Sequence, residues 1–182
     1  MSTLISVGGT GQHVALAALR LKTLGALPED LMLVAIDASD ESEISKRLRR
    51  PWSGADVGDA HPLGLKRISP PFAMSGIQSQ TFSQMYPQTL LEGFYSPAEA
   101  GLPVSDGMFG TPSVGASVVA GAFDSEIGKQ LASLPAQPFF VAGSVIGGTG
   151  AGVMHKILHL LHQSHGVADV FGVFLLRWFD VS

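Results

Sequence analysis

The chain has 182 residues, of which 46% are apolar and 14% are charged, and its formal net charge is −4. High hydrophobicity with low charge excludes intrinsic disorder, because a disordered chain lacks the apolar surface needed to form a core. The negative charge argues against a dedicated nucleic-acid binder, which carries a basic face. The absence of cysteine excludes a disulfide scaffold, a cysteine nucleophile and a thiolate metal site.

No targeting or membrane segment is expected. The first charged residue is Arg20, so the basic region that opens a signal peptide is missing. The uncharged stretch 138–154 is interrupted by five glycines, which favours a buried strand entering a loop over a membrane span. We therefore expect a soluble, cytoplasmic protein.

The first fifty residues alternate between apolar runs and helical patterns. Residues 4–7 predict a short strand, the glycine-rich residues 8–11 a loop, and the apolar spacing of residues 14–24 a helix that ends at a glycine. Residues 31–36 form a near-continuous apolar run, typical of a strand that is covered on both faces. A short helix is expected to follow at residues 39–50, because basic side chains gather in its last turn.

The rest of the chain contains an irregular insertion and then the same alternation. Residues 51–110 hold most of the prolines and are read as the insertion. The predicted elements are a helix near Ser79–Leu91, a helix at Val114–Leu131, a strand at Phe139–Ala142, a helix at Val153–Gln163 and a strand at Val170–Leu176. The paired phenylalanines of both strands are expected in the core. The repeated order of strand, glycine loop and helix predicts one α/β domain over residues 1–182, with a mostly parallel sheet and helices on both faces.

Two copies of one short motif are the most specific feature of the sequence. Gly8-Gly9-Thr10-Gly11 and Gly147-Gly148-Thr149-Gly150 each follow an apolar strand and precede a helix. A backbone without Cβ atoms can approach an anion closely, and a helix N-terminus presents free N–H groups and a positive dipole end. Because two such segments occur in one small domain, we predict a nucleotide or phosphate site.

The known phosphate motifs fit these segments unequally. A P-loop needs a lysine, but His13 follows the first segment and Val153 the second. A Rossmann dinucleotide site would use the first segment and Asp37 at the end of the second predicted strand. Val14 stands where its third glycine belongs, and such a site gives no reason for the second segment. A Rossmann-type NAD(P)-binding oxidoreductase domain is kept as the alternative.

Four segments together resemble the tubulin/FtsZ superfamily. Residues 147–152 resemble its glycine-rich signature, residues 8–13 its first phosphate loop, residues 35–39 its metal-phosphate region, and residues 107–115 the loop that faces the γ-phosphate. They occur in the family's order across nearly the whole chain. Ile146 replaces the first glycine of the signature and Ala151 its hydroxyl residue, so the chain looks like a divergent tubulin-like protein.

The resemblance implies a Rossmann-like domain that binds GTP or GDP with Mg²⁺. The nucleotide-binding residues it implies are Gly8, Gly9, Thr10, Gly11, Gln12, His13, Asp37, Gly110, Thr111, Gly147, Gly148, Thr149 and Gly150. Gly110 and Thr111 would face the γ-phosphate, His13 the sugar or base, and Asp37 or Asp40 could approach Mg²⁺ without a direct metal site being assigned.

Self-assembly is also implied by the resemblance. Head-to-tail filaments of this family switch with their nucleotide, and the acids that activate water come from a second domain of the next subunit. That second domain is not recognised here, so GTPase activity is expected only on assembly or with the missing domain. A module that binds nucleotide without hydrolysing it is the remaining alternative.

Three other features receive plainer interpretations. His155, His159 and His162 share one helical face, but no carboxylate joins them, so an exposed or partner-facing stripe is favoured over a metal site. The basic run 46–50 is read as a solvated helix end. Residues 111–115 fall short of a hydrolase nucleophile elbow, because its first glycine is absent.

Overall fold

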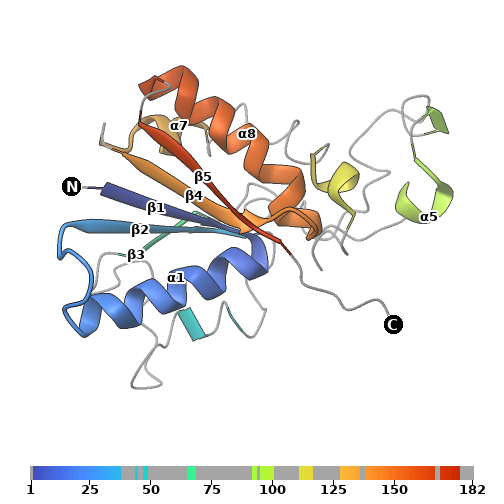
Figure 1. Ribbon diagram of the computed structural model, residues 1–182. Coiled ribbons are helices and arrows are strands. Elements are labelled where there is room, and N and C mark those ends of the chain that lie inside the picture. The colour runs from blue at the N-terminus through green and yellow to red at the C-terminus, as the bar shows by residue number, and fades with distance from the viewer. Residues whose placement is uncertain are drawn as a thin grey trace.

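The computed structural model describes residues 2–37, 44, 47–48, 65–68, 92–93, 95–100, 111–116, 128–135, 138–166 and 169–176. Five strands form one sheet: β1 (Ser2–Val7), β2 (Leu31–Ile36), β3 (Leu65–Ile68), β4 (Phe139–Ser144) and β5 (Val170–Leu175). Their order is β3-β2-β1-β4-β5, and every neighbouring pair is parallel. The predicted α/β class with a parallel sheet is therefore confirmed (Figure 1).

Two long helices cover the two faces of this sheet. Helix α1 (Gly8–Thr23) follows β1 directly, and α8 (Gly148–His165) follows β4. Figure 1 shows them on opposite faces of the sheet. Two short helices, α5 (Pro97–Ala100) and α7 (Gly128–Ala132), complete the labelled elements. Helix α1 stops where Gly25 takes φ 70°, a left-handed conformation that glycine adopts without steric cost.

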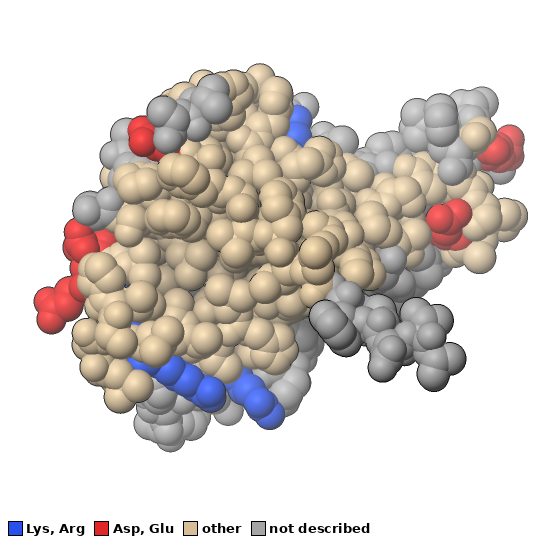
Figure 2. All heavy atoms as spheres, viewed as in Figure 1, with Lys and Arg blue, Asp and Glu red and all other residues tan. Residues whose placement is uncertain are grey.

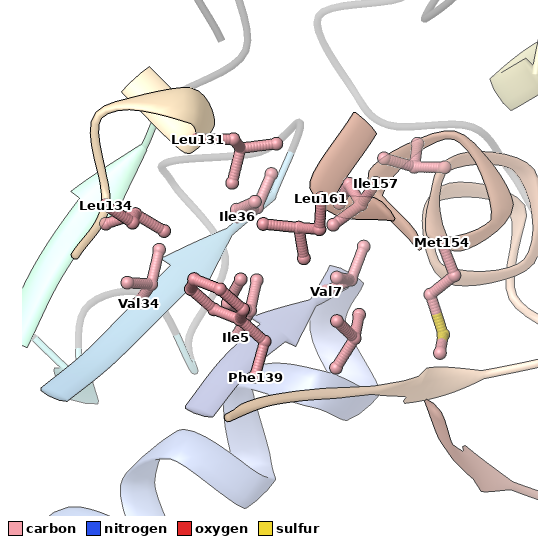
Figure 3. Close-up of a cluster of buried hydrophobic side chains, with 12 residues drawn as sticks. Ile5, Val7, Val34, Ile36, Leu131, Leu134, Phe139, Met154, Ile157 and Leu161 are labelled. Carbon is pink, nitrogen blue, oxygen red and sulfur yellow. The ribbon is translucent and has the colours of Figure 1, made fainter. Parts of the chain in front are cut away.

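Each face of the sheet has its own apolar core. On the α8 face, buried side chains of β1, β2 and β4 pack against α7 and α8 (Figure 3). On the α1 face, the cluster consists of Ala15, Leu16, Ala18, Leu19, Leu31, Leu33, Ala35, Ile44 and Leu48. Alternate residues of one strand point to opposite faces, so β2 contributes to both clusters. Its apolar run therefore has the predicted cause, which is burial on both sides.

The helix starts differ from the prediction. The segments 8–11 and 148–152, expected as loops, are the first turns of α1 and α8. Glycine costs a helix about 1 kcal/mol per residue relative to alanine, so the sequence reads locally as loop. Long-range packing, described below, accounts for glycine at several of these positions.

Two observed elements were not predicted, and three predicted helices lie partly or wholly outside the described residues. Strand β3 and helix α5 lie inside the insertion 51–110 and were not predicted. The helix expected at 79–91 lies outside the described residues, as does most of the one expected at 39–50, of which Ile44 and Leu48 are helical and buried. The helix expected at 114–131 is described only at its two ends, where residues 112–116 and α7 are helical.

The paired phenylalanines were assigned to the core too generally. Phe139 is fully buried, but Phe140, Phe171 and Phe174 are 37%, 48% and 54% exposed. Strand β5 is exposed or half-buried along its whole length. Within the parts of the chain described, no helix is long and apolar enough to cross a membrane.

Candidate functional site

The strand order reverses between β1 and β4, which is the position of the ligand crevice in open parallel sheets. These two strands are neighbours, whereas the chain leaves β1 toward β2 on one side and leaves β4 toward β5 on the other. Ligands of open parallel sheets bind outside the carboxyl ends of the strands at such a reversal point. The two Gly-Gly-Thr-Gly segments follow these two strands, so the topology brings both of them to the crevice.

The two segments touch each other through their backbones. A Cβ atom placed on Gly8 would lie 2.9 Å from the backbone nitrogen of Gly150 and 3.4 Å from Cβ of Thr149. Gly8 also has φ +71°, a conformation that side chains other than glycine rarely adopt. The first turns of α1 and α8, which are 140 positions apart in the sequence, are therefore in direct contact at the end of the sheet.

At the N-termini of α1 and α8, no capping side chain accepts a hydrogen bond from the first backbone N–H groups. The residues before the helices, Val7 and Gly147, make no side-chain capping hydrogen bond, and neither first turn contains an acidic residue. The first N–H groups of a helix have no partner inside it, and the helix dipole places partial positive charge there. Two such ends in contact create a neighbourhood that favours an anion.

The positive potential at the two helix starts comes from backbone groups, because basic side chains lie elsewhere. On the face shown in Figure 2, Lys and Arg lie along the lower edge and at one spot near the top, and Asp and Glu lie at the left and right margins. The first turns of α1 and α8 contain no basic side chain. An anion at this place would be held by N–H groups and hydroxyls rather than by ammonium or guanidinium groups of these turns.

Three of the six motif glycines, Gly8, Gly11 and Gly150, are required by packing. A Cβ on Gly11 would lie 2.8 Å from the carbonyl oxygen of Ala142, and one on Gly150 would lie 2.7 Å from the carbonyl oxygen of Ser144. These glycines let α1 and α8 start against the strand ends at backbone contact distance. Packing therefore accounts for these glycines without a ligand.

Two motif glycines have no such packing role. Among the described residues, and apart from the neighbouring helix backbone, no atom lies within 4 Å of a Cβ placed on Gly9, and the nearest atom to one on Gly147 is Cβ of Ser144 at 3.9 Å. Gly9 and Thr10 are exposed, while Gly147 and Thr149 are half-buried. These four residues form the open part of the two segments, where a ligand has room to approach.

Gln12 and Asp37, both predicted site residues, are joined by a hydrogen bond. Nε2 of Gln12 donates to Oδ2 of Asp37, which connects the second turn of α1 to the end of β2. Gln12 is 1% exposed and Asp37 is half-buried. The pair fixes the carboxylate of Asp37 beside the crevice, at the position from which a Rossmann acid would contact a ribose.

A third predicted segment also reaches the crevice. A Cβ on Gly115 would lie 2.4 Å from the carbonyl oxygen of Gly148, and one on Gly152 would lie 2.6 Å from the carbonyl oxygen of Pro112. Residues 112–116 therefore pack on the first turns of α8, with half-buried Thr111 just before them. The glycine contact between Gly115 and α8 was not predicted, because no local pattern signals a distant backbone.

The remaining predicted residues are one exposed histidine and two residues outside the described parts of the chain. His13 is exposed, and its imidazole makes no hydrogen bond, ion pair or ring contact with a described residue. Gly110 and Asp40 lie outside the described residues. In the described parts, no group of three or more His, Asp or Glu is placed to hold a metal ion.

Comparison with known proteins finds similarity among solved structures, and none among protein-family models or curated proteins. Among solved structures, the chain is similar to CetZ2 from Haloferax volcanii, a GTPγS-bound protofilament, with 20% identity and a TM-score of 0.48. The match covers 96% of this chain and 39% of CetZ2.

Proposed function

We propose that this chain is a nucleotide-binding domain whose ligand places its phosphates between the first turns of α1 and α8. The observation that carries the proposal is the contact of the two glycine-rich helix starts at the crevice between β1 and β4. Their N–H groups supply the positive potential, and the open positions Gly9 and Gly147 supply the space. The hydroxyls of Thr10 and Thr149 are further donors on the same two turns.

Guanine nucleotide is the proposed ligand, on the resemblance of the four sequence segments to tubulin and FtsZ. In that arrangement Gly110 and Thr111 would face the γ-phosphate. Mg²⁺ is held in proteins by one or two carboxylates together with phosphate oxygens and water. Asp37 fits this role through one carboxylate oxygen or through water, since Gln12 already bonds the other oxygen.

Assembly into head-to-tail oligomers, with hydrolysis completed by a neighbouring subunit, is the finer part of the proposal. It rests on the same resemblance. The described site holds donors and one carboxylate, but no second acid or base beside the crevice. Binding without hydrolysis is therefore the expected behaviour of the isolated chain.

An NAD(P)-binding domain is the second candidate, and one observation favours it. The strand order β3-β2-β1-β4-β5 is that of the doubly wound dinucleotide fold, and Asp37 follows β2 as the ribose-binding acid would. The hydrogen bond from Gln12 and the valine at position 14 count against it. The two candidates share the phosphate position and differ in the base.

The test is calorimetric titration of the chain with GTP, GDP, ATP and NAD in the presence of Mg²⁺, using Gly9→Asp and Gly9→Asn variants. Both side chains extend into open space, so both variants should fold. An added carboxylate at a helix N-terminus stabilises the helix but repels a phosphate. The proposal expects guanine nucleotides to bind wild type, Gly9→Asn to weaken binding by bulk alone, and Gly9→Asp to abolish it.

The outcomes separate the candidates. Binding of NAD in preference to GTP would replace the guanine proposal by the dinucleotide one. Binding of GTP that Gly9→Asp leaves unchanged would place the phosphates elsewhere and contradict the assigned site. Failure of all four ligands to bind the folded wild-type chain would contradict nucleotide binding by this chain.

A further inference from the structure

A row of histidines on α8 lies apart from the crevice. His155, His159 and His162 are exposed, whereas Ile157 and Leu161 on the opposite side are fully buried in the α8-face core. The expectation of an exposed stripe is thus met. None of the three imidazoles makes a hydrogen bond, ion pair or ring contact with a described residue.

His155 and His159 have the spacing of a helical chelate. Residues four apart lie on one face of a helix, about 6 Å apart along its axis. Two histidines with this spacing reach a single metal ion in the His-x-x-x-His arrangement of helical zinc sites. Imidazole nitrogen is a preferred ligand of Zn²⁺, Cu²⁺ and Ni²⁺. We propose that His155 and His159 bind one divalent transition-metal ion, with Zn²⁺ as the reference ligand, on the outer face of α8.

The helix holds these two residues on a rigid backbone. Val153, Met154, Ile157 and Leu161 anchor the same turns in the core. The helix carries no acidic residue, so no carboxylate on it completes a closed site. Two imidazoles leave the other positions of a four-coordinate ion to solvent, which makes the site open rather than structural.

His162 is excluded from this site by distance along the helix. It is seven positions from His155, about 10 Å along the axis, so one ion does not take all three rings. This agrees with the finding that no described trio of histidine and acidic side chains is placed to hold a metal. His159 could instead pair with His162 three positions later, and the experiment separates the two pairs.

Calorimetric titration of the untagged chain with ZnCl₂ tests the proposal. Wild type should bind a single ion per chain. His155→Gln and His159→Gln should each weaken binding by at least about tenfold, which is the lower end of the effect of losing even an outer partner of a metal site. His162→Gln and His13→Gln are matched controls that should bind like wild type. All four residues are exposed, so glutamine should leave the fold intact.

Thermal unfolding gives a second readout. An ion that binds the folded helix and not the unfolded chain raises the midpoint, in wild type and His162→Gln but not in His159→Gln. Loss of binding in His162→Gln, with His155→Gln unaffected, would assign the ion to the other pair. Unchanged affinity in His159→Gln, or one ion shared by two chains, would overturn the site within one helix.

Discussion

Glycines at the starts of α1 and α8 differ in what surrounds them. That difference predicts opposite effects of a glycine-to-alanine substitution on the free energy of unfolding. A Cβ on Gly150 would press on the carbonyl oxygen of Ser144, whereas one on Gly9 at the start of α1 meets nothing. Overpacking of this kind costs about 1–3 kcal/mol. We expect Gly150→Ala to lower the free energy of unfolding by that amount. Gly9→Ala should raise it by up to about 1 kcal/mol through helix propensity. Urea denaturation measures both, and a loss in Gly9→Ala would refute the open position.

The hydrogen bond between Gln12 and Asp37 is expected to stabilise the fold as well as position the carboxylate. A hydrogen bond to a charged group contributes about 1.5–3 kcal/mol. Gln12→Leu fills the same buried space without the donor, so it should lose free energy of unfolding in this range. Asp37→Ala, which removes the acceptor, provides the second arm of a double-mutant cycle. A coupling energy near zero between the two substitutions would show that the bond contributes nothing.

At the scale of an element, the short helix α5 shows how side chains cap the N-terminus of a helix. Ser96 precedes Pro97, and the backbone N–H and hydroxyl of Ser96 both donate to the carboxylate of Glu99. In return the backbone N–H of Glu99 donates to Oγ of Ser96 at 3.3 Å. This is a capping box, and it follows from the sequence Ser-Pro-Ala-Glu alone.

The capping box predicts a pH dependence of α5. The backbone N–H of Ser96, followed by its hydroxyl, lowers the pKa of the Glu99 carboxyl below its ordinary value. A folded pKa below the unfolded one means that the box stabilises the helix above the unfolded pKa. That contribution is lost as the pH falls through the folded pKa. A carboxyl-carbon NMR titration should give a lower pKa for Glu99 in wild type than in Ser96→Ala. Because Ser96→Ala keeps the backbone N–H, equal values would contradict the bond from the hydroxyl.

For the whole molecule, the four strands with apolar sequences were predicted, including the exposed strand β5. The run 31–36 is uniformly apolar because both cores need it, and its predicted bounds match β2. Strand β3 was missed because its sequence, Leu-Lys-Arg-Ile, carries two charges and has four residues. Its assignment depends on pairing with β2, which no local pattern encodes.

The position of the candidate site was predictable in part, because the apolar strands that precede it were recognised from the sequence. A repeated motif after two apolar strands located it, since parallel strands end at one edge of a sheet. Which glycines serve packing and which leave space depends on contacts such as Gly8 with Gly150 and Gly115 with Gly148. These join segments more than thirty positions apart, so sequence alone assigned all the glycines to the ligand.

The two faces of strand β4 differ in burial, and this difference predicts unequal effects of substitutions on stability. Phe139 is buried against α8, whereas Phe140 lies on the α1 face, where its ring stacks on Phe171 across the parallel pair with centroids 5.4 Å apart. Truncating a buried phenylalanine costs about 3–5 kcal/mol, but an exposed stacked pair contributes only about 0.5–1.5 kcal/mol beyond its buried area. We therefore expect Phe139→Ala to unfold far more readily than Phe171→Ala in urea.

The same substitutions should separate stability from solubility. Phe140, Phe171 and Val173 expose apolar surface at the β5 side of the sheet, and contiguous exposed apolar surface promotes association. Phe171→Ser should therefore bind less of a hydrophobic dye and scatter less light at high concentration than wild type, despite its slightly lower stability. Phe139→Ser should do the reverse, because it releases the core. An increase of scattering in Phe171→Ser would mean that the ring contributes to the fold rather than to an exposed surface.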